Sequence, residues 1–204
     1  MADKLIQQAE ERVLRRLMTF TDCLYALGVV LIIQWLPLPS ESHATGGIWL
    51  LDLFAEYSQN LLAVFIGVVF IVLYWIRSNH LLNELQRSNG VHVAFCMAQV
   101  FFILMLLYIV RVSGEIEPAS ARAGESIVLI LTGLFGALGW RYAGTKGLVR
   151  KGVSKEDMQK IYIEAYAEPL AALVTLPFAF VGELVWNLAW LAYIPIARFV
   201  RARH

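Results

Sequence analysis

The sequence predicts an all-α membrane protein with six transmembrane helices. Of its 204 residues, 59% are hydrophobic and 16% are charged, whereas a soluble domain is about half apolar and about a quarter charged. The apolar residues form continuous runs rather than alternating ones, which favours helices over the strands of a membrane barrel. A net charge of +1 gives no indication of nucleic-acid binding. We therefore expect one membrane-embedded domain over residues 1–204.

Six apolar segments account for the predicted spans, since a helix needs about 17–25 such residues to cross a bilayer. They cover residues 17–37, 58–76, 91–112, 126–143, 162–181 and 184–200. Only Gly182 and Glu183 separate the last two segments, so these residues are expected to form a turn. Residues 1–16 have apolar side chains at helical spacing between charged ones, which predicts an amphipathic helix.

The basic residues predict the orientation. Of the 17 lysines and arginines, 15 lie before the first span, after the second, after the fourth or after the sixth, and only Arg111 and Arg122 lie in the other loops. By the positive-inside rule both termini are cytoplasmic. The opposite side gathers acidic residues, and an acidic mouth would concentrate cations. These residues are Glu41, Asp52, Glu56, Glu115, Glu117, Glu125 and Glu183.

Two further segments are expected to lie at the membrane surface. Residues 45–58 contain aromatic and aliphatic side chains that suit an interfacial helix or an extension of the second span. Residues 144–160 form a basic cytoplasmic loop, for which anionic lipid headgroups are the expected partner. Ser154, followed by Glu156 and Asp157, has the pattern of a helix start.

Asp22 is the first candidate for a functional residue, because it falls within the first membrane span. An ionisable group at that depth costs a few kcal/mol unless it is paired. Trp75, Asn79 and His80, at the end of the second span, are at the right depth to pair with it. A polar clamp between the first spans is therefore expected.

No pattern of catalytic or metal-binding residues is present, so we do not expect an enzyme or a bound cofactor. The carbonyl filter of ordinary potassium channels and an arginine-repeat voltage sensor are also absent from the sequence. Leu27, Val30, Leu31 and Gln34 share one face of the first span. That face suits contact with lipid, helix packing or the lining of an oligomeric pore.

The start of the first span resembles a family signature. Arg16-x-x-x-Phe20-Thr21-Asp22 is similar to the Arg-x-x-x-Phe-Ser-Asp signature of the transmembrane protein 175 family of potassium channels. Trp75 and His80 resemble the Trp/His pair that ends the second helix in that family. Six spans in about 200 residues, with both ends inside, resemble its prokaryotic members.

The resemblance implies a homotetrameric, potassium-permeable channel whose first helix lines a central pore. It implies a hydrophobic constriction at Leu27, with Val30 or Leu31 and then Gln34 above it. Arg16, Phe20, Thr21, Asp22, Trp75 and His80 would hold the helices together behind the pore. Thr21 replaces the usual serine and keeps its hydroxyl. Val30 replaces a threonine of many members and cannot stand in for the water of an ion, so the resemblance does not carry potassium-over-sodium selectivity to this chain.

The remaining expectations follow from this reading. The partners are further copies of the chain, membrane lipids and monovalent cations, and the location is the cell membrane, in bacteria the inner membrane. A secondary transporter is an alternative, based on Glu164, Glu168 and Glu183 with Pro169 and Pro177 breaking the helix. A membrane scaffold without transport is a third possibility.

Overall fold

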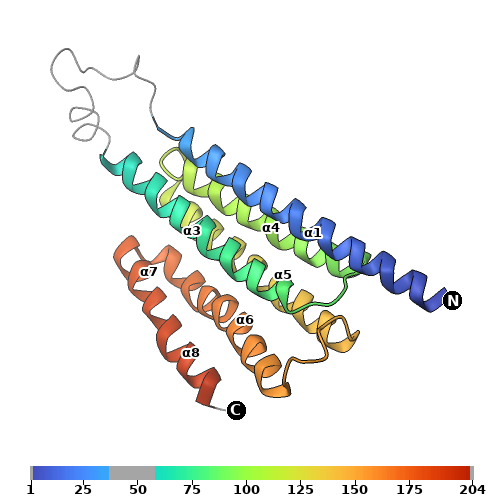
Figure 1. Ribbon diagram of the computed structural model, residues 1–204. Coiled ribbons are helices and arrows are strands. Elements are labelled where there is room, and N and C mark those ends of the chain that lie inside the picture. Colours follow the sequence, from blue (N-terminus) through green and yellow to red (C-terminus); the bar gives the residue numbers. More distant parts are fainter. Residues whose placement is uncertain (1, 37–57, 203–204) are drawn as a thin grey trace.

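The computed structural model describes residues 2–36 and 58–202, which form a bundle of helices (Figure 1). Its long helices are α1 (Ala2–Ile33), α3 (Ser58–Asn83), α4 (Gly90–Val112), α5 (Pro118–Thr145) and α6 (Lys155–Thr175). Four short helices complete the chain: η1 (Leu176–Phe180), α7 (Glu183–Ala189), η2 (Trp190–Ala192) and α8 (Tyr193–Ala202). The predicted all-α class is confirmed. The expected surface segment at 45–58, except its last residue Ser58, lies outside the described residues, as do the acids Glu41, Asp52 and Glu56.

Several helices are long and apolar enough to cross a membrane. Among the described residues, four segments meet both conditions: Lys4–Ile33, Gly90–Val112, Pro118–Thr145 and Glu156–Phe180. Helix α3 has 26 residues, which is also sufficient in length. The segment 184–200, by contrast, is not one helix, because α7, η2 and α8 divide it into pieces of 7, 3 and 10 residues. A multi-span helical protein is thus confirmed, whereas the number of six spans stays a prediction.

The ends of α1 differ from the expected boundaries. The amphipathic segment and the first span are one continuous helix of 32 residues. This helix ends at Ile33 rather than near residue 37, and a turn follows in which the backbone N–H of Trp35 donates to the Ile32 carbonyl at 2.9 Å. Pro37 supplies the physical reason, since the residue before a proline avoids helical geometry.

Two helix starts depend on acceptor side chains. Ser154 accepts a hydrogen bond from the backbone N–H of Asp157 at 3.0 Å, so the helix start predicted there is confirmed. Glu117 accepts from the backbone N–H groups of Ala119 and Ser120 at the start of α5. These hydrogen bonds, the Ala119 one above all, lower the pKa of Glu117 because they favour its charged form.

Pro169 lies inside α6, so the expectation that it breaks the helix is wrong. It packs against Gly133 of α5, where an added Cβ would stand 2.5 Å from the proline Cδ. A proline within a membrane helix is tolerated when neighbouring helices pack around it. The change from α-helix to 3₁₀ helix comes later, at Leu176 and Pro177.

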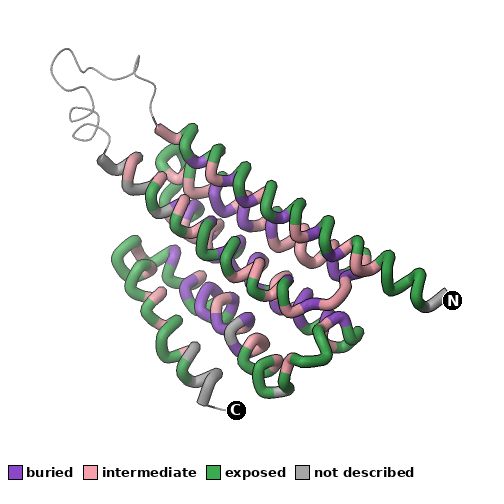
Figure 2. The backbone as a smooth tube through the Cα atoms, in the orientation of Figure 1, coloured by how far each residue is buried: buried purple, intermediate pink, exposed green. Residues whose placement is uncertain are grey.

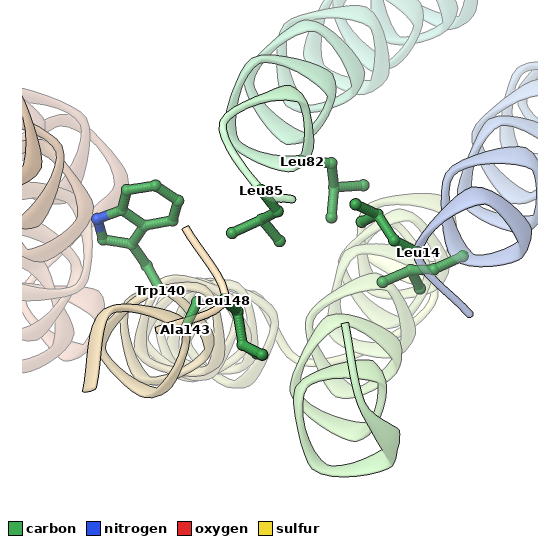
Figure 3. Packing of buried hydrophobic residues seen from close by; sticks show 7 residues of the cluster. Leu14, Leu82, Leu85, Trp140, Ala143 and Leu148 are labelled. Atoms are coloured by element: carbon green, nitrogen blue, oxygen red, sulfur yellow. The ribbon is translucent and has the colours of Figure 1, made fainter. Parts of the chain in front are cut away.

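Figures 1 and 2 show the long helices side by side, and the most extensive helix contacts are those of α5 with α4 and α6. Helix α5 lies between α4 and α6, and α1 packs against α3 and α4. One buried cluster joins α1, α3, α5 and the loop after α5 (Figure 3). Its members are Leu14, Leu17, Leu82, Leu85, Trp140, Ala143 and Leu148.

Three parts of the chain meet at this end of the bundle. The backbone N–H of Gln86 donates to the Leu148 carbonyl, and that of Arg150 donates to the Glu84 carbonyl, each at 2.9 Å. Arg87 forms an ion pair with Glu10 of α1 at 3.3 Å. The N-terminal helix and the loops at 84–89 and 147–150 therefore lie together, as the orientation requires, and Figure 1 shows both termini toward the same end. Which side of the membrane this end faces stays a prediction.

Candidate functional site

The candidate site is the outward face of α1. The buried side of this helix repeats every three or four residues, with Leu14, Leu17, Thr21, Tyr25 and Ile32 facing α3 and α4. The opposite side exposes large apolar side chains, and Figure 2 shows this exposed stripe along α1. Leu27 is 50% exposed, Val30 54% and Leu31 42%, so about half of each side chain is uncovered by the rest of the chain. Such a face needs lipid or another copy of the chain against it.

The far end of this stripe differs from the expected geometry. Gln34 was expected on the same helical face as Leu27, but α1 ends at Ile33 and Gln34 belongs to the following turn. Ile33, three residues after Val30, is also exposed, at 52%. Ile32 is the fully buried residue at this level. Ile33 therefore shares the exposed face with Val30, and a substitution there is no control for the stripe.

The structure joins Asp22 to the second long helix. The indole Nε1 of Trp75 on α3 donates a hydrogen bond to Asp22 Oδ1 at 2.7 Å. This distance is short for an N–H···O bond, as expected when the acceptor is ionised. Thr21, the neighbouring signature residue, is buried and donates to the carbonyls of Leu17 and Met18 within α1 itself.

The other signature residues are not gathered around Asp22. Arg16 and His80 are exposed and have no hydrogen bond within the described parts of the chain. Phe20 is 53% exposed and lies on the outward side of α1. Asp22 and Trp75 therefore form the polar contact, and the side chains of Arg16, Phe20 and His80 are exposed.

Small residues bring α1 and α3 together, a feature that the sequence analysis missed. A Cβ added at Gly28 of α1 would collide with Ile71 of α3, and one added at Gly67 of α3 would stand 3.3 Å from Ile32. Close packing of membrane helices commonly uses small residues in this way. Gly28 within the first apolar span was the signal that could have indicated this contact.

A second polar contact lies between α3 and α6. Arg77 forms an ion pair with Glu168 at 2.6 Å, and the side chains are 35% and 15% exposed. Sequence analysis singled out Glu168 but not its partner, which is 91 positions away. Glu183 is exposed at the start of α7, and the side chain of Glu164 lies outside the described residues.

The described residues offer apolar packing surfaces and the two polar contacts above. No group of three or more histidine, cysteine, aspartate or glutamate side chains there could hold a metal ion. Cys23 and Cys96 are free, and Cys23 is exposed on the outward side of α1, not buried. The clearest feature of this face is the exposed apolar stripe. The Asp22–Trp75 hydrogen bond and the close approach of Gly28 to Ile71 hold the helix that carries it against α3.

Comparisons with known proteins agree with the motif. Residues 16–106 match the family model described as endosomal/lysosomal potassium channel TMEM175. The fold is similar to the crystal structure of a lysosomal potassium-selective channel TMEM175 homolog from Chamaesiphon minutus, with a TM-score of 0.70 over 93% of this chain and 98% of that one, at 14% identity. The search of curated proteins finds no match. The resemblance to the transmembrane protein 175 family is thereby confirmed, in sequence over residues 16–106 and in fold over most of the chain.

Proposed function

We propose that this chain is a potassium-permeable cation channel of the cell membrane, built as a homotetramer of one domain over residues 1–204. The observation that carries the proposal is the uncovered stripe of Leu27, Val30 and Leu31 on α1. One helix cannot enclose a pore, whereas rotational symmetry closes one from a single helix of each subunit. The family model that matches residues 16–106, which include this stripe, is that of a potassium channel.

The constriction is a ring of leucines from Leu27. An ion that enters an apolar ring must give up water with nothing to replace it, so the ring blocks conduction unless it widens. Val30 and Leu31 continue the apolar lining. Gln34, in the turn after α1, presents an amide at the outer mouth, where it can contact a partly hydrated cation.

The proposal also specifies the ions, lipids and membrane that the channel contacts. Monovalent cations pass along the axis, and no cofactor is needed for this. Anionic lipid headgroups lie against the basic side chains at the end of α5 and in the loop after it, including Arg141, Lys146, Arg150 and Lys151. In a bacterial cell the expected place is the inner membrane, with both termini in the cytoplasm.

The carboxylates that favour a transporter have other roles in this arrangement. Glu168 is bound to Arg77 in an ion pair. Glu183 is exposed at the start of a seven-residue helix. Neither contributes to a shared polar site with the other, so a channel is the better-supported function.

Cation flux into liposomes tests the proposal. Leu27→Asn places four amides in the ring and lets water enter, so the resting potassium flux should rise above that of the wild type. Leu173→Asn is the matched control, because it introduces the same amide in place of an exposed leucine of α6, outside the α1 stripe. Unchanged flux in Leu27→Asn together with a rise in Leu173→Asn would place the pore on another helix. An absence of flux in every protein would remove the channel proposal.

Cross-linking tests the assembly separately. Cys23 is a free, exposed cysteine on the outward side of α1. If four α1 helices surround one axis, mild oxidation should join Cys23 of neighbouring subunits into a covalent dimer. Cys23→Ser should lose this product, while Cys96→Ser should keep it. A monomer under oxidation, in protein that is otherwise intact, would contradict the central position of α1.

A further inference from the structure

A large cavity lies apart from the α1 stripe, and none of its described lining residues belongs to α1. It has a volume of about 790 Å³, and α3 to α6 line it together with α7, η2 and α8. Its walls are aliphatic and aromatic, with Phe70, Leu129, Trp186, Trp190 and Tyr193 among them. This volume is within the range of pockets that hold drug-sized molecules.

The shape of the cavity is fixed by polar contacts. Trp186 of α7 donates from its Nε1 to Ser126 Oγ of α5 at 2.9 Å, and Ser126 lies 3.1 Å from Thr175 Oγ1. Trp186 and Trp190 meet edge to face, with ring centroids 6.0 Å apart. The hydrogen bond holds α7 to α5, and α8 packs against α6, so the aromatic wall is a defined surface.

The cavity is lined by two acidic side chains and one basic side chain. Arg77 and Glu168 both line it, and they neutralise each other in the 2.6 Å ion pair. Glu125 also lines it, and no hydrogen bond or ion pair within the described ranges involves its carboxylate. Arg122, one turn earlier on α5, attracts Glu125 electrostatically but donates from its Nε to the Ala179 carbonyl. An apolar, aromatic cavity thus contains one carboxylate without a bound partner.

We propose that this cavity is a binding site for a lipophilic amine, a protonated nitrogen attached to an apolar body. The ammonium group would form a charge-assisted hydrogen bond to Glu125. The aromatic wall of Trp186, Trp190 and Tyr193 adds the attraction of ring faces for a cation. The apolar body would fill the space lined by Phe70 and Leu129.

The carboxylate selects this ligand class over others. A fatty acid or an anionic lipid would bring a second negative charge close to Glu125 in surroundings of low polarity, which is unfavourable. A neutral molecule would fill the cavity but leave Glu125 without a partner. A lipophilic amine with one positive charge both fills the cavity and pairs with the Glu125 carboxylate. The site involves none of the stripe residues of α1, so it goes beyond the channel function and its test needs no ion flux.

The test measures binding of 4-(4-fluorophenyl)butylamine to the full chain in phosphatidylcholine nanodiscs by ¹⁹F NMR. Empty nanodiscs correct for partition into lipid, and 4-(4-fluorophenyl)butanol is the uncharged counterpart of the probe. The amine should bind saturably and more tightly than the alcohol. Glu125→Gln should weaken amine binding about tenfold or more and should leave the alcohol unaffected. Glu115→Gln, an exposed acid outside the cavity, is the matched control and should bind like the wild type.

A second variant keeps the test decisive if Glu125→Gln does not fold. Val110→Trp places a large side chain in the cavity from α4 without changing Glu125, and it should weaken the binding of both probes. Circular dichroism verifies that each variant is helical. Equal binding of amine and alcohol, or amine binding that survives both Glu125→Gln and Val110→Trp, would overturn the proposal.

Discussion

Trp75 on α3 donates its indole N–H to the carboxylate of Asp22 on α1, with 2.7 Å between the two atoms. This contact and the Gly28–Ile71 contact both join α1 to α3. Asp22 fixes the depth of α1 along α3, and the glycine fixes how closely the helices approach. Together they set the rotation of α1, and with it the side chains that α1 turns outward.

Loss of the Asp22–Trp75 hydrogen bond should lower stability. Asp22→Ala and Trp75→Phe should each reduce the free energy of unfolding by about 1–3 kcal/mol, because a hydrogen bond to a charged acceptor is lost. Asp22→Asn should cost less, since its amide oxygen still accepts. Unfolding in detergent, followed by circular dichroism, measures these losses.

A double-mutant cycle is the check on this pair. The double variant should cost little more than either single variant, because both remove the same contact. If the two losses simply add, Asp22 and Trp75 do not stabilise each other. Strong changes in flux with unchanged stability would mean instead that Asp22 contacts the permeating ions.

The sequence was sufficient for features that depend on local pattern. Continuous apolar runs predicted the helical class, and Ser154 predicted the start of α6 because capping is decided within one turn. The charge of Asp22 at membrane depth predicted a polar partner, and Trp75 was among the candidates. These features need only spacing and hydropathy, which are readable along the chain.

Features that depend on packing between distant segments were not predictable. Arg77 and Glu168 are 91 positions apart, and nothing in either segment indicates the other. Pro169 was expected to end a helix, but its contact with Gly133 of α5 lets α6 continue. The cavity around Glu125 results from the way α7, η2 and α8 return along the bundle, which hydropathy does not describe.

The Gly28 contact should tolerate no larger side chain. Gly28→Val adds atoms where even a Cβ would collide with Ile71, which is 1% exposed and has little room to move. Overpacking of this kind costs about 1–3 kcal/mol. Unfolding in detergent should show this loss, and cation flux should also change because α1 is displaced from α3.

Two variants serve as controls for this substitution. Gly114→Val should be nearly neutral, since no atom lies within 4 Å of a Cβ added there. Ile71→Ala should partly restore the stability of Gly28→Val by making room for the new side chain. A fully stable Gly28→Val protein with normal flux would show that α1 and α3 pack less closely than this contact requires.

The ion pair of Arg77 and Glu168 should behave as a partly buried pair. Arg77→Met leaves the Glu168 carboxylate, only 15% exposed, without its cation. Removing one partner of a buried pair is costly because the other charge stays poorly solvated, so we expect a loss of about 2–3 kcal/mol. Glu168→Gln should cost less, because the Arg77 side chain is 35% exposed and keeps more of its water.

The double variant tests whether the loss in Arg77→Met comes from an unpaired Glu168 charge. Arg77→Met with Glu168→Gln should be more stable than Arg77→Met alone, because no charge is then left unpaired. Lys160→Gln is the surface control, since Lys160 and Asp157 form an ion pair with side chains 71% and 59% exposed, and it should cost at most about 0.5 kcal/mol. Detergent unfolding at two salt concentrations separates the pairs, because salt weakens an exposed pair more than a buried one. If Arg77→Met costs no more than Lys160→Gln, α3 and α6 are held together by their apolar contacts, and the ion pair adds nothing to them.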